Sequence, residues 1–431
     1  MGKLAKANGA GVGVYGSILA VPNEIGWAEP SGGGSMVFFV AIWIAIVSFG
    51  LAFAVFAAYF FLVLRTDKVP DYLHQLELAA EEALNGEFPM ISMLIPAHNE
   101  ADVIGMKLRD VADMEYPRDR REIIVIDDAS TDRTHAIAEQ TLREFNLPGR
   151  VVACESRTGV NGCYNLGFKE SKGAFIVTTD ADVKVDHDAL LKSMKIISRL
   201  SSVGGVTSRM KPISLGQTSA AKIEGPYRSF YDAMLVAESA IHSTFPGYTN
   251  FALVRRSAFP TMPLGYGSTD GNLSLAIVRQ GLRYICVPSI VFYEPIVVGV
   301  REQLRQKTRR AARQIQAAAA NLGILFNPKC GEFGALIFPL RLLMMVSSLF
   351  CLVGVVAVAV AVASVSALLL PAIPLLIIGL YLASKRSSKA GLLWSLIVHE
   401  FYLLMGLIYS PRRGSAWRSM ERTSIAAATR P

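Results

Sequence analysis

Two aspartates one residue apart follow an apolar run near the middle of the chain. The segment TTDADVKV, residues 178–185, contains Asp180 and Asp182. Alternate residues of an extended segment point to the same side, so both carboxylates can face one ligand. Neighbouring carboxylates repel each other unless a cation lies between them, and a hard divalent ion such as Mg²⁺ binds such pairs together with substrate phosphates. The alternative is a solvated loop after a strand, where aspartate is common.

The residues around this pair predict strands that alternate with helices. Four apolar runs predict short buried strands, at 90–96, 122–128, 150–156 and 174–180. The segments between them predict helices at about 99–113, 130–145 and 160–171, the second of them capped by Ser130. Continuous apolar strands separated by helices are typical of a parallel sheet that is covered on both faces.

Polar motifs follow three of the four predicted strands. They read PAHNE, DDASTD and TDAD in chain order. On open sheets of this kind, ligands bind at the carboxyl ends of the strands. The sequence therefore predicts a ligand site at the edge where the three motifs meet.

Five motifs in sequence resemble family 2 glycosyltransferases. PAHNEADV and VIDDASTD, at the ends of the first two strands, resemble the nucleotide-binding half of that family. PGYTNFALVRRSAF (246–259) is similar to its acceptor-side loop and strand, and STDGNLSLAIVRQGLRY (268–284) to its catalytic Thr-Glu-Asp helix. QKTRR (306–310) is similar to the Gln-x-x-Arg-Trp segment of membrane-bound synthases, of the hyaluronan, chitin and cellulose type. The resemblance covers about 90–315.

The resemblance implies a GT-A fold, an α/β unit with a doubly wound, mostly parallel sheet in a cytoplasmic domain flanked by transmembrane helices. It also implies a Mg²⁺ or Mn²⁺ cofactor, ligated by Asp182 and Asp180, with Asp180 beside the ribose and diphosphate. The other residues that it assigns to the donor are Pro96, His98, Asn99, Glu100, Asp127 for the base, Asp128, Gln306, Arg309 and Arg310. Plainer roles stay open, since Pro96 can end a strand, Asp128 can hold a turn or cap a helix, and His98 can pack beside a strand.

Asp270 matches the last residue of the Thr-Glu-Asp motif, which is the general base of the family. An acceptor hydroxyl is a poor nucleophile until its proton is removed, and a positioned base contributes about 10²–10⁴-fold to the rate. One base without a covalent intermediate implies inversion at the anomeric carbon. The alternative is an acidic residue favoured at a helix N-terminus by the helix dipole.

The chain departs from the family pattern at three positions. Thr269 stands where the motif has glutamate, and Arg310 stands where the synthases have tryptophan. Val160 stands where the family has lysine, with Arg157 as a substitute. These changes bear on acceptor placement and on processivity.

Long apolar segments flank this region. Residues 36–64 carry no charge, and further apolar blocks run from 333 to 384 and from 391 to 410. About 20 apolar residues span a bilayer, so we expect membrane-spanning helices. The resulting division is a flexible leader (1–35), a transmembrane helix (36–64), a linker or amphipathic helix (65–89), the transferase domain (90–300), a basic interfacial helix (301–332), transmembrane or interfacial helices (333–410) and a basic tail (411–431).

The net charge of +8 is concentrated beside the apolar blocks, in 301–313, 385–389 and 410–414. Basic runs beside spanning helices favour the cytoplasmic face. We therefore expect a multi-pass protein of a prokaryotic plasma membrane with a cytoplasmic catalytic domain. One apolar piece is interfacial or re-entrant on this topology, near Arg341 or the His399–Glu400 pair. The five cysteines have no paired spacing that suggests a disulfide framework or a zinc site.

The expected function is transfer of a sugar from a nucleotide sugar at a membrane. A UDP-sugar is the expected donor. The acceptor is a growing polysaccharide, or a polyprenyl phosphate or glycolipid that receives one sugar. We expect membrane lipids as neighbours and no nucleic acid. A non-catalytic membrane component that senses nucleotide sugars is the alternative from another class, and the two aspartates Asp182 and Asp270 argue against it.

Overall fold

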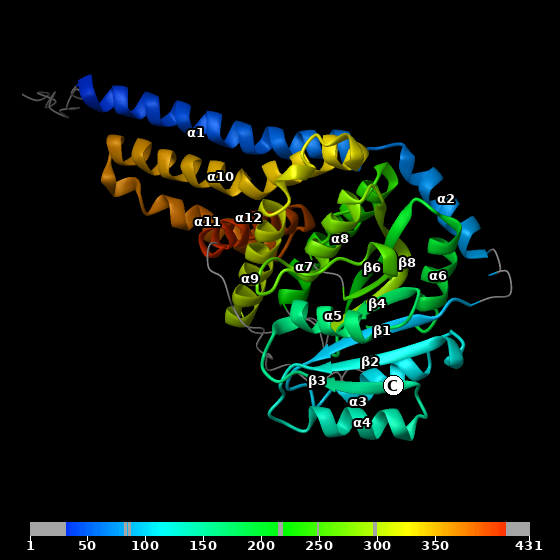
Figure 1. The fold of residues 1–431 in the computed structure, drawn as a ribbon. Coiled ribbons are helices and arrows are strands. Elements are labelled where there is room, and N and C mark those ends of the chain that lie inside the picture. Colours follow the sequence, from blue (N-terminus) through cyan, green and yellow to red (C-terminus); the bar gives the residue numbers. More distant parts are fainter. Residues whose placement is uncertain are drawn as a thin grey trace, which may run out of the picture.

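The computed structural model describes residues 32–81, 84, 88–213, 219–247, 250–295 and 300–410. The predicted leader through residue 31 and the basic tail 411–431 lie outside the described residues, as do two residues of the motif at 246–259. An α/β domain carries long helices that extend from one side (Figure 1). The described strands are β1 (Ile91–Ala97), β2 (Arg121–Asp127), β3 (Gly149–Ala153), β4 (Phe175–Thr179), β5 (Lys184–Val185), β6 (Val203–Ile213), β7 (Phe251–Arg255) and β8 (Arg283–Pro295).

The helices of the domain and of the apolar segments follow the predicted order. They are α1 (Gly32–Tyr59), α2 (Lys68–Glu81), α3 (Ile104–Ala112), α4 (Thr134–Glu144), α5 (Gly159–Glu170), α6 (Ala189–Arg199), α7 (Ser219–Ile241), α8 (Thr269–Arg279), α9 (Val300–Ala319), α10 (Phe338–Val365), α11 (Ala372–Ser384) and α12 (Ser388–Tyr409). The four strands predicted between 90 and 180 and the helices between them are confirmed, with shifts of a few residues at their ends.

The strands form one mixed sheet in the order β3-β2-β1-β4-β7-β6-β8-β5. The half that contains the polar motifs is parallel, with Ile91 of β1 opposite Arg121 of β2 and Phe175 of β4. In the other half β7 runs antiparallel to both β4 and β6, and β8 runs parallel to β6. The fold is therefore the α/β type expected, and β7 inserts an antiparallel strand next to the parallel half.

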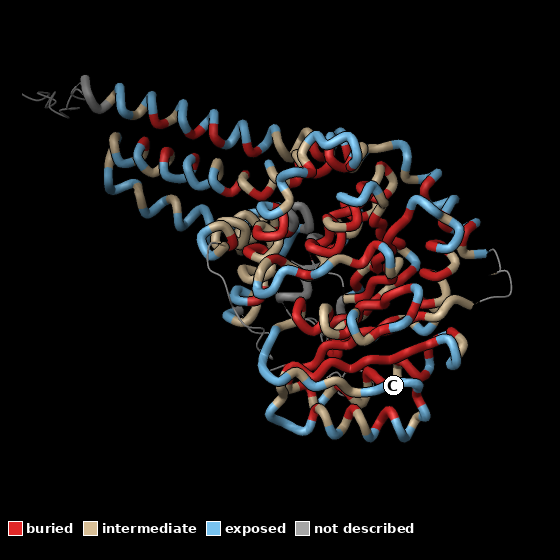
Figure 2. Tube along the Cα trace, in the orientation of Figure 1, coloured by how far each residue is buried: buried red, intermediate tan, exposed pale blue. Residues whose placement is uncertain are grey.

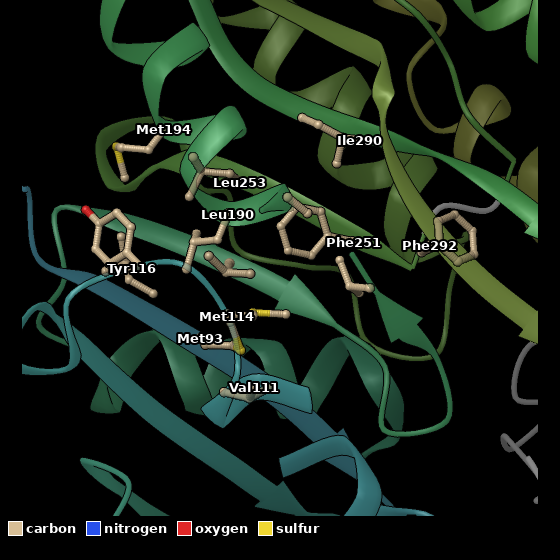
Figure 3. Packing of buried hydrophobic residues seen from close by; sticks show 14 of the residues in the cluster. Met93, Val111, Met114, Tyr116, Leu190, Met194, Phe251, Leu253, Ile290 and Phe292 are labelled. Carbon is tan, nitrogen blue, oxygen red and sulfur yellow. The ribbon is translucent and has the colours of Figure 1, made fainter. Parts of the chain in front are cut away.

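The core lies on both faces of the sheet, which explains why the strands are apolar throughout. Every residue of β1 and β2 is buried, and the buried residues of Figure 2 are concentrated in the sheet and the helices against it. Met93, Leu190 and Phe251 meet in the largest cluster (Figure 3). Burial of each such side chain contributes about 1.5–3 kcal/mol.

Three helical segments are long and apolar enough to cross a membrane: Ser35–Leu64, Phe333–Val365 and Ala367–Ser384. α1 and α10 lie side by side along their lengths, and α11 follows α10 (Figure 1). The shorter apolar helix Leu393–Tyr409, in α12, packs instead against α9, α7 and α10.

A buried ion pair joins the apolar helices to the α/β domain. The Glu238 carboxylate on α7 accepts hydrogen bonds from Arg341 of α10, at 2.5 Å from Nε and 3.1 Å from Nη2. Tyr59, at the end of α1, donates its hydroxyl proton to Glu238 at 2.6 Å. Thr244 adds another donor at 2.7 Å. Arg341, one of the charged residues that stood out in the apolar sequence, thus pairs with the domain.

We predict that Arg341→Met destabilises the protein by about 3–5 kcal/mol, because it leaves the carboxylate of Glu238 buried without its cation. Thermal unfolding in detergent measures the change. Lys68→Met is the matched control, because Lys68 pairs with Glu332 at 2.8 Å where both side chains are about half exposed. That pair is worth less than about 1 kcal/mol. Equal losses in the two variants would contradict the buried pair as the main link.

Candidate functional site

The loops that follow β1 and β2 are joined by hydrogen bonds. The Asn99 N–H donates to Ser130 Oγ at 3.0 Å, and Asn99 Oδ1 accepts from the Thr131 N–H at 2.8 Å. The Glu100 N–H donates to Thr134 Oγ1 at 2.8 Å. Asn99 has a φ of 52°, a left-handed conformation that asparagine tolerates better than most residues. The first two polar motifs therefore form one continuous surface at the carboxyl edge of the sheet.

Ser130 does not cap α4, contrary to the sequence prediction. α4 begins at Thr134, whose N–H donates to the Asp132 carboxylate at 2.9 Å. The Ser130 hydroxyl is instead the acceptor for Asn99. The prediction was wrong because contact with the loop after β1 determines the role of this hydroxyl, and that contact is not visible in the local sequence.

The adjacent aspartates at the end of β2 contact different elements. Asp127 accepts from the Ser130 N–H at 3.0 Å and from His135 Nδ1 at 3.2 Å. Asp128 is fully buried and accepts from the N–H groups of Thr158 and Gly159, at 2.6 and 3.0 Å. The carboxylate of Asp128 therefore holds the start of α5.

The other residues predicted for the donor pocket begin at β1. Pro96 lies inside β1, opposite Ile126, and does not end the strand. His98 Nδ1 donates to the Asp128 carbonyl at 2.8 Å. Arg157, the predicted substitute for a family lysine, lies 3.7 Å from the carboxylate of Asp128. These contacts give His98 and Arg157 a place beside the turn after β2.

A buried lysine holds the turn that carries Asp180 and Asp182. Lys107 of α3 is 2% exposed, and its Nζ donates to Thr179 Oγ1 at 2.7 Å and to the Val183 carbonyl at 3.0 Å. Burial lowers the pKa of Lys107 to about 8, while the charges of Asp110 and Asp180 oppose the shift. The two bonds bracket the acidic pair.

Lys107 was missed by the sequence analysis. Its only signal is its position in the apolar stripe of α3, between Ile104, Leu108 and Val111. A charged residue in such a stripe requires buried acceptors.

The acidic turn suits a hard divalent cation. Asp182 is 6% exposed and Asp180 is half-buried, so both carboxylates are drawn partly out of water one residue apart. Carboxylate oxygens are the donors that Mg²⁺ and Mn²⁺ accept. The residues present therefore fit the cofactor that the resemblance implies.

Tyr164 connects the acidic turn to Asp270. Burial raises the pKa of the Tyr164 hydroxyl well above its usual value, and the charges of Asp180 and Asp270 raise it further. The hydroxyl also forms a hydrogen bond with Asp180. Asp270 lies in the first turn of α8, which Ser268 caps by accepting from the Gly271 N–H. The side chains of Asp180 and Asp270 therefore both lie near enough to the Tyr164 hydroxyl to raise its pKa.

Thr269, where the family motif has glutamate, pairs with α5. Its hydroxyl donates to Asn161 Oδ1 at 2.8 Å, and Asn161 Nδ2 donates to the Pro263 carbonyl at 2.8 Å. The sequence analysis did not single out Asn161. The pair fixes the start of α8 against the start of α5, which Asp128 holds from the other side.

α9 brings arginines to the same region. Burial and the charges of Arg310 and Arg313 lower the pKa of Arg309 to about 10, and Asp180 opposes the shift. Arg310 forms an ion pair with Glu294 of β8 at 2.7 Å. Several guanidinium groups crowded together favour an anionic ligand such as a diphosphate.

The same helix also holds the start of α8. The Ser268 N–H donates to the Arg313 carbonyl at 3.0 Å, and the Gly267 N–H donates to Gln316 Oε1 at 3.0 Å. Gln306, predicted to bind the diphosphate, lies buried on α9. The same Gln316 amide donates from Nε2 to the carbonyl of Ser410, at the end of α12. α9 is thus fixed between the candidate base and an apolar helix.

The mixed α/β sheet and its covering helices have the GT-A-like glycosyltransferase fold. Residues 92–260 match the family model described as Glycosyl transferase family 2, so the chain contains a family 2 glycosyltransferase domain.

Curated relatives agree with this class. The chain is 28% identical to the "Probable glycosyltransferase YdaM" of Bacillus subtilis over 52% of this chain and 55% of that protein. It is 31% identical to the "Beta-monoglucosyldiacylglycerol synthase" of Nostoc sp. over 30% of this chain and 28% of that protein. It is 27% identical to the "Poly-beta-1,6-N-acetyl-D-glucosamine synthase" of Staphylococcus epidermidis over 42% of each. The chain thus spans about half or less of the length of these relatives.

A solved structure with the same fold spans nearly the whole described chain. It is the mannosyltransferase PcManGT from Pyrobaculum calidifontis in complex with GDP-Man and Mn²⁺, with a TM-score of 0.64 and 23% identity. The alignment covers 87% of this chain and 99% of that one. At this identity the likeness establishes the fold.

We predict that Lys107→Met lowers the free energy of unfolding by about 1–3 kcal/mol, because two buried acceptors lose their donor. Chemical or thermal denaturation in detergent measures it. Lys192→Met is the control, since Lys192 pairs only with the part-exposed Asp188 on its own helix among the described contacts. It should change stability by less than about 1 kcal/mol. A Lys107 variant as stable as the control would show that the acidic turn does not need this cation.

Proposed function

We propose that the chain is a membrane-anchored, inverting glycosyltransferase that moves a sugar from a nucleoside diphosphate to an acceptor at the membrane surface. The observation that carries the proposal is the family 2 glycosyltransferase match at residues 92–260, and Tyr164 supports it, since burial and then the charges of Asp180 and Asp270 raise the pKa of its hydroxyl. A donor held at the acidic turn then lies within the domain that also holds the candidate base.

The donor is held by both halves of the site. The loops after β1 and β2, with Asp127, receive the nucleoside, and Asp128 holds the turn that supports them. Asp182 and Asp180 would hold Mg²⁺ or Mn²⁺, whose charge would stabilise the leaving diphosphate. Arg309 adds positive charge from α9, where burial strengthens its attraction for phosphate oxygens.

Asp270 is the proposed base. It removes the proton of the acceptor hydroxyl as the hydroxyl oxygen attacks the anomeric carbon, and the nucleoside diphosphate departs from the opposite face. The Tyr231 hydroxyl accepts a hydrogen bond from the Gly247 N–H. The loop at 242–247, part of the segment similar to the family's acceptor-side loop, is proposed for the acceptor side. Thr269 and Asn161 orient the start of α8, so that the carboxylate is positioned before substrate binds.

We propose a lipid-linked acceptor that receives one sugar. A conduit for a polysaccharide needs helices that surround it and shield its hydroxyls from lipid. In the described part of the chain, α11 has no buried residue, and most of the outward-facing side chains of α1 and α10 are exposed and apolar. These helices suit an anchor that lies among lipids.

The position of α12 suits the same arrangement. Lys307 of α9 lies 5.4 Å from the ring of Tyr402 on α12, and Gly406 packs against Ala311. We propose that α12 lies at the cytoplasmic membrane surface, beneath the active site, so that a lipid head group reaches Asp270 without leaving the bilayer. We further propose that the donor is a UDP-sugar and that the protein lies in the plasma membrane of a prokaryote.

Two aspartate substitutions test the assigned roles. Asp182→Asn should weaken Mn²⁺-dependent binding of UDP, since one ligand is lost. Asp270→Asn should leave that binding intact and lower transfer by about 10²–10⁴-fold, the contribution of a general base. Calorimetry with UDP and Mn²⁺, with GDP as the comparison nucleotide, measures the first effect, and radiolabel transfer measures the second.

Loss of UDP affinity in Asp270→Asn would contradict the role of base. A wild-type protein that binds nucleotide but transfers sugar from no donor to any lipid or glycan would instead support a sensor.

Product size distinguishes the acceptor classes. Incubation of the purified protein with labelled UDP-sugars and membrane lipids should give a single lipid-soluble product. A ladder of water-soluble products would overturn the single-addition proposal in favour of a polysaccharide synthase. Asp270→Asn protein in the same vesicles is the control for transfer by contaminants.

A further inference from the structure

Two thiols face each other between the end of β3 and the first turns of α5. Cys154 Sγ, Cys163 Sγ and a carboxylate oxygen of Asp128 all lie within 4.8 Å of one another. The hydroxyl of Thr158 lies 3.9 Å from each sulfur atom. The sequence spacing of nine residues gave no indication of this pair, because β3 and α5 are brought together by the turn that Asp128 holds.

The two thiols differ in access. Cys154 is partly exposed, beside the exposed residues Glu155, Ser156 and Arg157, whereas Cys163 is fully buried. Hydrogen bonds with Cys163 and Thr158 lower the pKa of the Cys154 thiol to about 7, against its partial burial and the charges of Asp128 and Asp127. The bond to Cys154 and burial raise the pKa of Cys163. One thiol is thus accessible and readily ionised, and its partner is protected.

A metal site formed by Asp128, Cys154 and Cys163 is less well supported than a disulfide between the two cysteines. The carboxylate of Asp128 already accepts hydrogen bonds from Thr158 and Gly159, and a metal ligand would have to give up part of that cap. A sulfur–sulfur bond needs no third ligand.

We propose that Cys154 and Cys163 form an intramolecular disulfide with low-molecular-weight disulfides, which makes this pair a modification site next to the nucleotide-binding loops. The thiolate of Cys154 attacks the small disulfide and releases one thiolate, which gives a mixed disulfide on Cys154. Cys163 then loses its proton and attacks Cys154 Sγ, which releases the second small thiol. Two electrons pass from the protein to the small disulfide, and the two protons end on the two small thiols.

The bond would alter the turn after β2. A disulfide requires the sulfur atoms to approach to about 2.05 Å, which would draw the end of β3 toward the start of α5 and change the contacts of the Thr158 hydroxyl, 3.9 Å from each sulfur atom. The same residue donates its N–H and its hydroxyl to Asp128, at 2.6 and 3.1 Å. Because the carbonyl of Asp128 is the acceptor for His98, the change reaches the surface proposed for the nucleoside. This consequence depends on the proposed function; the formation of the disulfide does not.

Peptide mass mapping of the full chain in detergent tests the site. After treatment with oxidised glutathione and alkylation, the wild-type peptides that contain Cys154 and Cys163 should be linked with the loss of two hydrogen atoms. Reduction with dithiothreitol should reverse the link.

Matched serine variants separate the steps. The Cys163→Ser variant should retain one glutathione on Cys154. In the Cys154→Ser variant, Cys163 should stay unmodified. Cys286 and Cys330, which are also buried, should stay unmodified in the wild-type chain. A wild-type chain that keeps glutathione on Cys154 without a link, or that does not react while Cys163→Ser does, would overturn the proposal.

Calorimetry with UDP and Mn²⁺ tests the consequence. The linked wild-type chain should bind about tenfold more weakly than the reduced chain, the change expected when one hydrogen bond to a charged group is lost. Cys154→Ser treated in the same way should keep its affinity. Equal affinity of linked and reduced protein would refute the effect on the nucleotide loops. A reduced wild-type chain that does not bind UDP would count against the proposed function and leave the mass result unaffected.

Discussion

The gathering of acidic side chains around the buried Tyr164 hydroxyl is the constraint on which the rest of the candidate site depends. Burial raises the pKa of that hydroxyl, and the charges of Asp180 and Asp270 raise it further. The ammonium group of Lys107, on α3, and the guanidinium group of Arg309, on α9, bring positive charge near Asp180. The carboxylates of the candidate site therefore have cationic side chains from two different helices near them.

Much of this arrangement could be predicted from the sequence. Strands that are buried on both faces are apolar without interruption, so β1, β2 and β4 were evident, and their polar ends indicated where the ligand site lies. The antiparallel β7 could not be predicted in the same way, because strand direction depends on connections that periodicity does not encode. The Asp180–Asp182 pair and Asp270 were evident as candidates because their residue types and order match the motifs of the family.

The supporting residues were harder to find because their partners are distant in the chain. Lys107 bonds to residues 72 and 76 positions away, and Asn161 bonds to Thr269 across 108 positions. Ser130 was assigned the wrong role for the same reason. Its hydroxyl accepts from the Asn99 N–H, which is distant in the sequence and is brought close by the fold. Arg341 was anomalous in an apolar segment of the sequence, and the structure explains it by the ion pair with Glu238 of α7.

The link between Tyr59, Glu238 and Arg341 has a consequence for how the chain is made. Synthesis proceeds from the N-terminus, so α1 and the α/β domain leave the ribosome before α10. Glu238 is then an acid in a closing core whose guanidinium partner has not yet been translated. The α/β domain therefore contains a buried carboxylate whose cation comes from a helix that is synthesised after the domain, so the completed core of the domain includes part of α10.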